Sequence, residues 1–272
     1  MKTTRILICC VGFALLSCAA CNQTKPTADL TAEPTPPPVE DLLTPDQVWD
    51  TFVAALPALN TYTYTTEKTT YRDLVTGELY PTPHQASLQG RGQDGRILQE
   101  FLGDRSGVLA KRMVIAGVVY EAQLQADLQD TWTLAYVPET PADLGHPFVL
   151  AELIGLGATG KFQQAEGGAY IYALTIPQPV MAAWLEAQYS RSVEAFENDW
   201  NDLTGFNFQS FKSLYDLLAV EQVVQVMLDD QSRLLATETT IQRVGEQQPV
   251  ELVLYQTTYT DLNLASVSVP QP

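Results

Sequence analysis

The chain has 272 residues, of which 46% are hydrophobic and 17% are charged, and its formal net charge is −17. Proteins that bind nucleic acids need clustered lysine and arginine to neutralise phosphates, so this composition argues against a nucleic-acid partner. An anionic membrane surface would also repel the body of the protein. Any attachment to a membrane must therefore come from another device.

The first residues have the pattern of an export signal. Lys2 and Arg5 precede the apolar run 6–16, which is too short to remain as a membrane-spanning helix. Leu15-Leu16-Ser17-Cys18 then resembles the lipobox of bacterial lipoproteins, in which the cysteine is lipidated and the chain is cleaved before it. We therefore predict a signal peptide over 1–17 and a lipid anchor on Cys18.

Cys21 is the second choice for lipidation. Two small alanines precede it, but Cys18 would then stand where the lipobox usually has leucine. All four cysteines lie at positions 9, 10, 18 and 21, so the folded part has no disulfide, thiolate metal cluster or cysteine nucleophile. We expect an exported protein anchored to the outer face of the bacterial cell membrane, or to the outer membrane in a two-membrane cell.

A proline- and threonine-rich segment over 18–43 has no apolar periodicity and is typical of an extended, disordered tether. No second break of this kind follows. Residues 44–272 are therefore predicted to form one domain, which we expect to be a monomer.

The structured part is predicted to begin with a helix. Thr44, Pro45 and Gln47 form a capping-box pattern, and the apolar residues that follow have helical spacing up to Pro57. Alternating aromatic and β-branched residues then indicate a strand over 62–71. Further strands are predicted at 97–102, 111–115, 118–124, 132–137 and 169–176, separated by turns that are typical of an antiparallel meander.

Helical spacing interrupts this strand pattern. A short helix is predicted over Asp143 to Ile154, a longer one over 180–196, and another after Thr204-Gly205. The chain is predicted to close with strands at 223–228, 234–242 and 250–259.

One motif suggests an enzyme at first sight. Gly155-x-Gly157-x-x-Gly160, followed by Lys161, has the spacing of a dinucleotide-binding loop. Such a loop follows a strand and opens a helix, whereas here a predicted helix precedes the glycines and a hairpin follows them. We interpret the glycines as a helix cap and a turn onto the next strand.

Other chemistry is weakly supported. His84 and His146 stand in turn-like contexts beside prolines, without a neighbouring ligand at metal spacing. The acidic pairs Glu197/Asp199 and Asp229/Asp230 are typical of solvated faces in a chain with 32 carboxylates. We therefore predict no catalytic residue, no metal, no cofactor and no enzymatic activity.

Several stretches resemble a known family. Gly117-Val118-Val119-Tyr120 before Trp132 is similar to a recurring strand pair of the LolA-like group, and closest to its LppX/LprG subfamily of lipoproteins. The stretch from Val224 to Leu235 resembles the "V-x-V-x-I-D" hairpin of that group, and Tyr259 to Pro270 resembles its terminal segment. The likeness covers roughly residues 44 to 270.

This resemblance implies an α+β fold: a strongly curved antiparallel half-barrel with an N-terminal helix and inserted helices over its concave face. It also implies a cavity that binds or transfers a lipid or acylated molecule. The candidate lining residues are aromatic and aliphatic strand positions: Tyr62, Tyr64, Leu98, Met113, Trp132, Leu134, Tyr170, Tyr172, Val226 and Leu254. Each of them also fits a packed core, which is the more common place for such strand residues. The alternative function is an extracytoplasmic sensor or interaction module that binds a protein partner.

Overall fold

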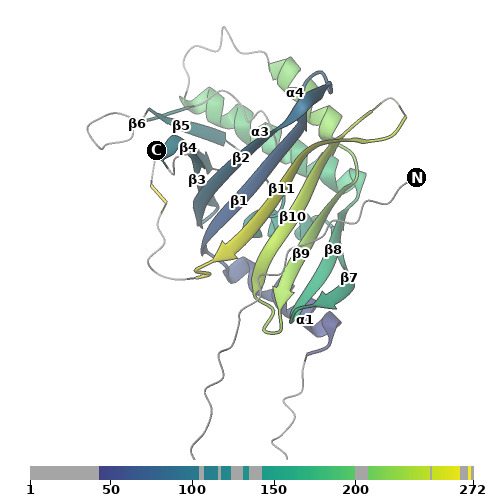
Figure 1. Ribbon diagram of the computed structural model, residues 1–272. Helices are drawn as coiled ribbons and strands as arrows, with labels where there is room; N and C mark the ends of the chain where they lie inside the picture. Colours follow the sequence, from purple (N-terminus) through teal and green to yellow (C-terminus); the bar gives the residue numbers. More distant parts are fainter. Residues whose placement is uncertain are drawn as a thin grey trace, which may run out of the picture. The chain divides into compact units, whose positions relative to one another are not determined.

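A single antiparallel sheet organises the structure, a computed structural model that describes residues 43–103, 107–115, 118–123, 131–134, 143–199, 208–245, 247–263 and 269–270 (Figure 1). Within these ranges the sheet has eleven strands in the order β6-β5-β4-β3-β2-β1-β11-β10-β9-β8-β7. The described residues belong to one unit, Asp41–Pro272. The predicted signal peptide, Cys18, Cys21 and nearly all of the predicted tether lie outside the described residues.

Along the described chain, six strands follow the first helix, two follow the second helix, and three follow the last two helices. The strands are β1 (Thr61–Arg72), β2 (Leu79–Gln93), β3 (Arg96–Leu102), β4 (Val108–Ile115), β5 (Val118–Gln123), β6 (Thr131–Leu134), β7 (Thr159–Glu166), β8 (Ala169–Ile176), β9 (Gln222–Asp229), β10 (Leu234–Arg243) and β11 (Val250–Thr260). The helices are α1 (Pro45–Ala55), with a 3-10 turn at Leu56–Ala58, α2 (Pro147–Gly155), α3 (Gln178–Asp199) and α4 (Phe208–Leu218). The α+β class, the N-terminal helix and the inserted helices are confirmed.

Helix α1 begins as predicted. The Thr44 side chain accepts a hydrogen bond from the Gln47 backbone N–H, and the Gln47 side chain accepts one from the Thr44 backbone. This reciprocal pair satisfies two donors that a helix start leaves free. Val48 and Phe52 then face the core, and the chain enters β1 shortly after the 3-10 turn ends.

The predicted strong curvature is wrong. Within the described residues the sheet is open, with β6 and β7 at its two edges, and it is not strongly curled. Sheets curl where bulges or glycine kinks bend the middle of their strands. Here the register shifts between inner strands lie near strand ends, as at Thr70/Arg72 and Ile241/Gln242.

Strand β2 contains a stretch that sequence patterns assigned to a turn. Pro81, Pro83 and His84 lie within this strand, although prolines lack the N–H that a central strand needs. Residues 79–86 pair only with β1, because β3 joins β2 from Ser87 onward. The prolines therefore occupy a part of β2 that has one neighbour, and the predicted turn-like context of His84 is wrong.

The glycine motif has the structure expected of a helix end. Helix α2 ends at Gly155, and Gly157 adopts a left-handed backbone conformation with φ of +111°. Strand β7 follows, and the turn Gly167-Gly168 leads into β8. The predicted cap and hairpin are confirmed.

Candidate functional site

One face of the sheet carries most of the buried side chains. Pairing places Tyr64 beside Tyr259, and Thr66, Thr257 and Thr237 in one row across β1, β11 and β10. The same row continues through Val226 and Tyr172 on β9 and β8. We call this side, defined by Tyr62, Tyr64, the threonine row, Val226 and Tyr172, the covered face. Helices α1 to α4 lie behind the sheet in Figure 1, and buried residues of all four helices belong to the same core as this face.

The ten candidate lining residues do not share a face. Tyr62, Tyr64, Tyr170, Tyr172 and Val226 lie on the covered face. Pairing places four others on the opposite side, which we call the outer face: Leu98, Met113, Trp132 and Leu254. The backbone of Leu134 in β6 pairs with Tyr120 of β5, and its side chain lies outside what the structure describes. Adjacent residues on a strand point to opposite faces. Ile97 and Tyr255 therefore point to the covered face, and their neighbours Leu98 and Leu254 point to the outer face. A ligand contact for any of the ten stays a prediction.

The outer face has a small core of its own. Leu98, Met113 and Val269 are buried together, with Trp132 packed against them. The Val269 backbone N–H donates a hydrogen bond to the Gln93 side chain, which holds the end of the chain against β2. The candidates Leu98, Met113 and Trp132 therefore belong to a cluster that is separate from the main core.

Two glycines make room for the aromatic part of the covered face. A Cβ atom at Gly92 would overlap the ring of Tyr62, and one at Gly90 would overlap the ring of Tyr64. Each tyrosine ring therefore lies across the neighbouring strand, at a position where only glycine leaves space. The Tyr64 hydroxyl can then donate a hydrogen bond to the Leu98 carbonyl, 3.2 Å away.

A short segment before α2 lies on this face. We call Asp143–His146 the plug. The Thr257 hydroxyl donates to the Asp143 carboxylate at 2.6 Å, and the Tyr259 hydroxyl donates to the Gly145 carbonyl at 2.8 Å. A Cβ at Gly145 would overlap the Thr237 side chain, so glycine permits this close approach. The plug is thus fixed by hydrogen bonds from β11 to both its backbone and its carboxylate.

His146 lies among aromatic rings at the end of the plug. Its ring makes an edge contact with the Tyr64 ring, with centroids 4.7 Å apart, and its Nδ1 lies 3.4 Å from the Tyr62 hydroxyl. Burial lowers the pKa of His146 from its ordinary value of 6.5, and the nearby Asp143 carboxylate opposes this shift in part. Burial, and then Asp143, raise the pKa of Tyr62 and of Tyr259.

Because His146 is buried with a lowered pKa, we expect the protein to lose stability in acid. Because its pKa is lower in the folded state, the unfolded state binds more protons below pH 6.5, so the free energy of unfolding should fall as the pH decreases from 6.5. The fall from this one group is limited to about 1.4 kcal/mol per pH unit. Urea unfolding at pH 7.5, 6.5 and 5.5 measures it. His146→Gln should reduce the slope between pH 6.5 and 5.5, and an unchanged slope would contradict this assignment.

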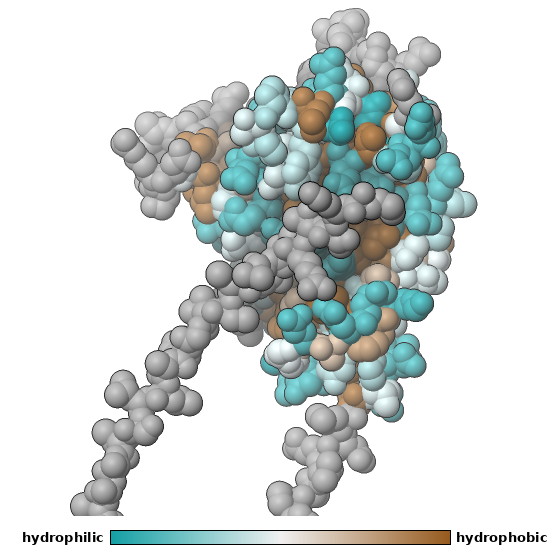
Figure 2. Space-filling view, turned by 45° about the vertical axis from the view of Figure 1, so that its right-hand side comes forward, coloured by the Kyte–Doolittle hydropathy of each residue, from teal (hydrophilic) through white to brown (hydrophobic). Residues whose placement is uncertain are grey.

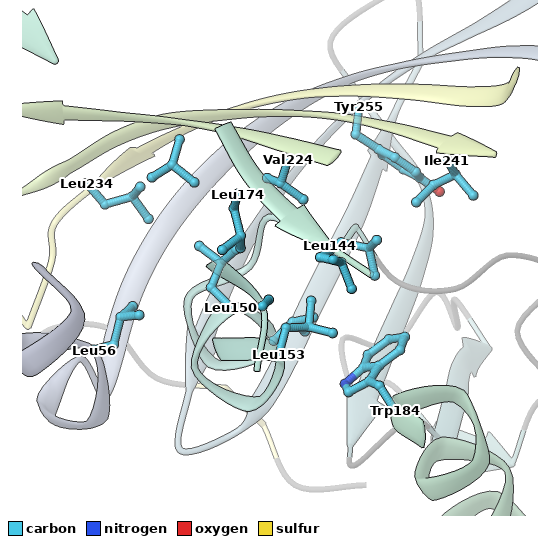
Figure 3. Close-up of a cluster of buried hydrophobic side chains, with 14 of the residues drawn as sticks. Leu56, Leu144, Leu150, Leu153, Leu174, Trp184, Val224, Leu234, Ile241 and Tyr255 are labelled. Atoms are coloured by element: carbon cyan, nitrogen blue, oxygen red, sulfur yellow. The ribbon is translucent and has the colours of Figure 1, made fainter. Parts of the chain in front are cut away.

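Helix α2 covers the middle of the face with leucines. Figure 3 shows Leu150 and Leu153 pointing from this helix toward Leu174 and Val224 of the sheet. Leu144 of the plug lies in the same cluster, and the three leucines are fully buried. This packing places the apolar side of the plug and α2 against the middle of the covered face.

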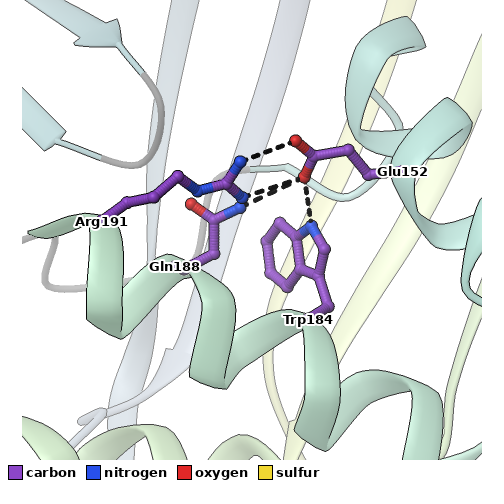
Figure 4. Close-up of polar contacts among 4 residues, drawn as sticks. All are labelled: Glu152, Trp184, Gln188 and Arg191. Atoms are coloured by element: carbon purple, nitrogen blue, oxygen red, sulfur yellow. Dashed lines mark hydrogen bonds and ion pairs between the residues drawn. The ribbon is translucent and has the colours of Figure 1, made fainter.

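A polar contact joins α2 to α3 (Figure 4). The Glu152 carboxylate accepts hydrogen bonds from Arg191 at 2.9 and 3.2 Å, from Trp184 Nε1 at 2.8 Å and from Gln188 at 3.3 Å. The donors lie on successive turns of α3. We call these four residues the clamp, because one side chain of α2 holds three side chains of α3.

Removing the clamp's charge should loosen the helices without unfolding the sheet. Glu152→Gln leaves one acceptor oxygen for three donors, and both members of the ion pair are about one-third exposed, at 36% and 33%. We expect a loss of about 1 kcal/mol, with faster hydrogen exchange in α2 and α3 and unchanged exchange in β10 and β11. Glu194→Gln, at an exposed position of α3, is the matched control. Equal effects of the two variants would contradict a specific role for Glu152.

No group of metal-ligating side chains is found among the described residues. His84 and His146 lie apart, since His84 stacks on Tyr80 of β2 while His146 is in the plug. Asp229 of the second acidic pair accepts hydrogen bonds from the Arg233 side chain and from two backbone N–H groups of its own turn. This carboxylate therefore serves the β9–β10 turn.

In the described part of the chain, no helix has the length and apolarity required to cross a bilayer.

Figure 2 shows hydrophobic surface (brown) recessed between hydrophilic residues (teal) on one side of the molecule.

Comparison with known proteins gave matches among solved structures. No protein-family model matches the chain, and no curated protein matches it. LprF from Mycobacterium bovis is 11% identical over 84% of this chain and 96% of that chain, with a TM-score of 0.37. An uncharacterized conserved protein from Thermus thermophilus is 8% identical over 80% of this chain and 88% of that chain, with a TM-score of 0.33. A LolA superfamily protein from Nitrosomonas europaea is 7% identical over 83% of this chain and 96% of that chain, with a TM-score of 0.30.

The structure is similar, at low sequence identity and low TM-score, to LprF and to a LolA superfamily protein. A hypothesis on function must therefore rest on this chain's own covered face, plug and clamp.

Sequence patterns missed the plug because they assigned Asp143 to a helix. The helix begins at Pro147, and the Asp143 carboxylate instead accepts a hydrogen bond from the Gly145 backbone at 2.9 Å. Aspartate two residues before glycine favours such a turn, and proline favours the first position of a helix. These two signals together would have separated the plug from α2.

Proposed function

We propose that the chain is a membrane-anchored, extracytoplasmic lipoprotein that binds or transfers a lipid or acylated molecule on the covered face. The observation that carries the proposal is the composition of the layer over this face. Helices and the plug, rather than a second sheet, cover it, and their leucines occupy a continuous apolar region between Leu174, Val224 and Ile241. Ligand sites are typically apolar with a few placed polar groups, which matches this face.

Burial of an acyl chain is worth more than the exposure of the three leucines that it would replace. An acyl chain of about sixteen carbons gains about 12 kcal/mol when it leaves water, at about 0.8 kcal/mol for each methylene. Exposing the buried leucines of the plug and α2 costs about 2 kcal/mol for each side chain. An acyl chain can therefore replace Leu144, Leu150 and Leu153 on the sheet with a net gain, provided that α2 can move away.

The layer over the face is built from separable parts. Helix α2 is joined to α3 through the Glu152 carboxylate, while α3 packs chiefly on α2 and α4. Displacing the plug and α2 would leave the strand pairing of β1, β11 and β10 intact. The predicted anchor at Cys18 would keep this movement close to a bilayer, because the several acyl chains of a lipoprotein terminus hold firmly.

Native mass spectrometry tests the proposal. The described core lies within residues 43–270, so protein produced from residue 22 onward retains it without the anchor. We expect a co-purifying mass of a lipid, or uptake of added phospholipid or palmitate. A domain that stays empty under both conditions would refute lipid binding and favour the alternative of a module that binds a protein partner.

A further inference from the structure

Four threonines stand in the middle of the covered face. Thr66, Thr257 and Thr237 pair across three strands and are 1%, 1% and 4% exposed, and Thr239 on β10 is 0% exposed. Valine has nearly the same shape and would pack on this apolar face without a polar group to satisfy. The hydroxyl groups therefore call for a role beyond packing.

One of these hydroxyl groups, that of Thr257, contacts the carboxylate of the plug directly. Thr66 and Thr257 share a hydrogen bond of 2.8 Å, and Thr257 donates at 2.6 Å to Asp143, which is 3% exposed. Among the described residues no lysine or arginine forms an ion pair with Asp143. The face thus holds a buried carboxylate through a neutral hydroxyl donor, Thr257, as a binding site for an anionic ligand could.

One of the four hydroxyls has no partner among the described residues, whereas Thr257 bonds the plug, Thr66 bonds Thr257 and Thr237 bonds the Tyr259 hydroxyl at 3.2 Å. Thr239 Oγ1 is buried and has no hydrogen-bond partner in the part of the chain that the structure describes. A buried hydroxyl without a partner costs free energy, so such groups usually have a partner in another state of the protein. Thr239 lies two residues from Thr237 on the same strand, and its side chain is on the covered face.

We infer that Thr66, Thr257, Thr237 and Thr239 form the binding site for the anionic headgroup of the acyl ligand, and that Asp143 occupies this site in the closed form. This inference rests on the proposed function. When the plug leaves, a carboxylate or phosphate replaces Asp143 on Thr257 and also reaches Thr239. The acyl chain then follows the strands over Val224, Leu174 and Ile241, which lie on the same face.

Thr239→Val tests the headgroup site without disturbing the closed form. The substitution removes a hydroxyl that has no hydrogen bond among the described residues, so the melting temperature should stay the same or rise. Binding of palmitate should weaken by about tenfold, since a hydrogen bond to a charged group is lost. Thr240→Val, on the outer face of the same strand, is the matched control.

The probes distinguish recognition of the acyl chain of the ligand from recognition of its headgroup. Palmitate and palmitoyl lysophosphatidic acid carry an anionic headgroup on an acyl chain, methyl palmitate carries a neutral ester, and acetate and inorganic phosphate are free anions. We expect wild type to bind both anionic lipids more tightly than methyl palmitate. The tighter of the two identifies the headgroup, and competition by acetate or phosphate would show that the anion is recognised without its chain.

The outcomes distinguish the two proposals. If wild type binds none of palmitate, palmitoyl lysophosphatidic acid and methyl palmitate, the proposed lipid binding fails. If it binds palmitate and methyl palmitate equally, or if Thr239→Val leaves the Kd of palmitate unchanged, lipid binding stands and the headgroup site is overturned. A tenfold loss for palmitate with no change for methyl palmitate supports the site.

Discussion

Gly92→Ala should destabilise the protein by about 1–3 kcal/mol, although alanine normally strengthens a strand relative to glycine. The added Cβ would overlap the Tyr62 ring, which then has to leave its place beside the plug. Gly90→Ala should act in the same way on Tyr64. Because the centroids of the two rings are 6.1 Å apart, the effects of the two substitutions should not add. Urea unfolding of both single variants and the double variant measures this.

Gly155→Ala is the control for the glycine substitutions. A Cβ at this position meets no atom within 4 Å, and Gly155 is the last residue of α2. Alanine should therefore leave the stability unchanged or raise it by up to about 1 kcal/mol. If Gly92→Ala is equally harmless, then the Tyr62 ring does not lie across β2 as the structure has it.

Leu150→Ala should lower the stability and increase ligand binding at the same time. Leu150 is fully buried between α2 and the sheet, and truncation of such a side chain costs about 2–5 kcal/mol. The space it leaves lies on the covered face, where we propose that an acyl chain binds. Urea unfolding should give a lower free energy of unfolding than wild type, and titration with a fluorescent fatty acid should give a lower Kd.

Met113→Ala separates this effect from general loosening. Met113 is also fully buried, but it lies in the cluster of the outer face with Leu98 and Val269. We expect a comparable loss of stability with no gain in binding. If both variants bind the fatty acid more tightly, the two faces are not distinct in function, and if neither does, α2 does not occupy the ligand's place.

Local patterns predicted most helices and strands. The capping box located the start of α1, and the run of aromatic and β-branched residues located β1, because short-range composition and spacing favour one kind of element. Strand β2 was not recognised, since its two prolines have the composition of a turn. Their place in the sheet depends on where β3 ends, and no pattern within β2 carries that information.

Assignment of strand residues to a face was less successful. Four of the ten candidate residues lie on the outer face, because a choice such as Leu98 over Ile97 depends on register across several strands. Both residues are apolar and buried, so hydropathy does not distinguish them. The plug was missed for a related reason: its buried Asp143 and His146 have partners that lie far away in the sequence, on β11 and β1.

The pairing of β1 with β11 also determines when this protein can fold. Thr63 lies beside Thr260, so the central strand pair joins the beginning of the domain to its end. Contacts that close such long loops form slowly, and a chain is synthesised with its N-terminal end first. The hairpins β1 to β5 can assemble early, but β1 keeps an open edge until the last strand arrives. A chain that stops before Val250 would expose two unpaired strands in the middle of its sheet, and such edges promote aggregation. Residues 250–260 therefore complete the sheet in a last step that removes the two unpaired edges at its middle, those of β1 and β10.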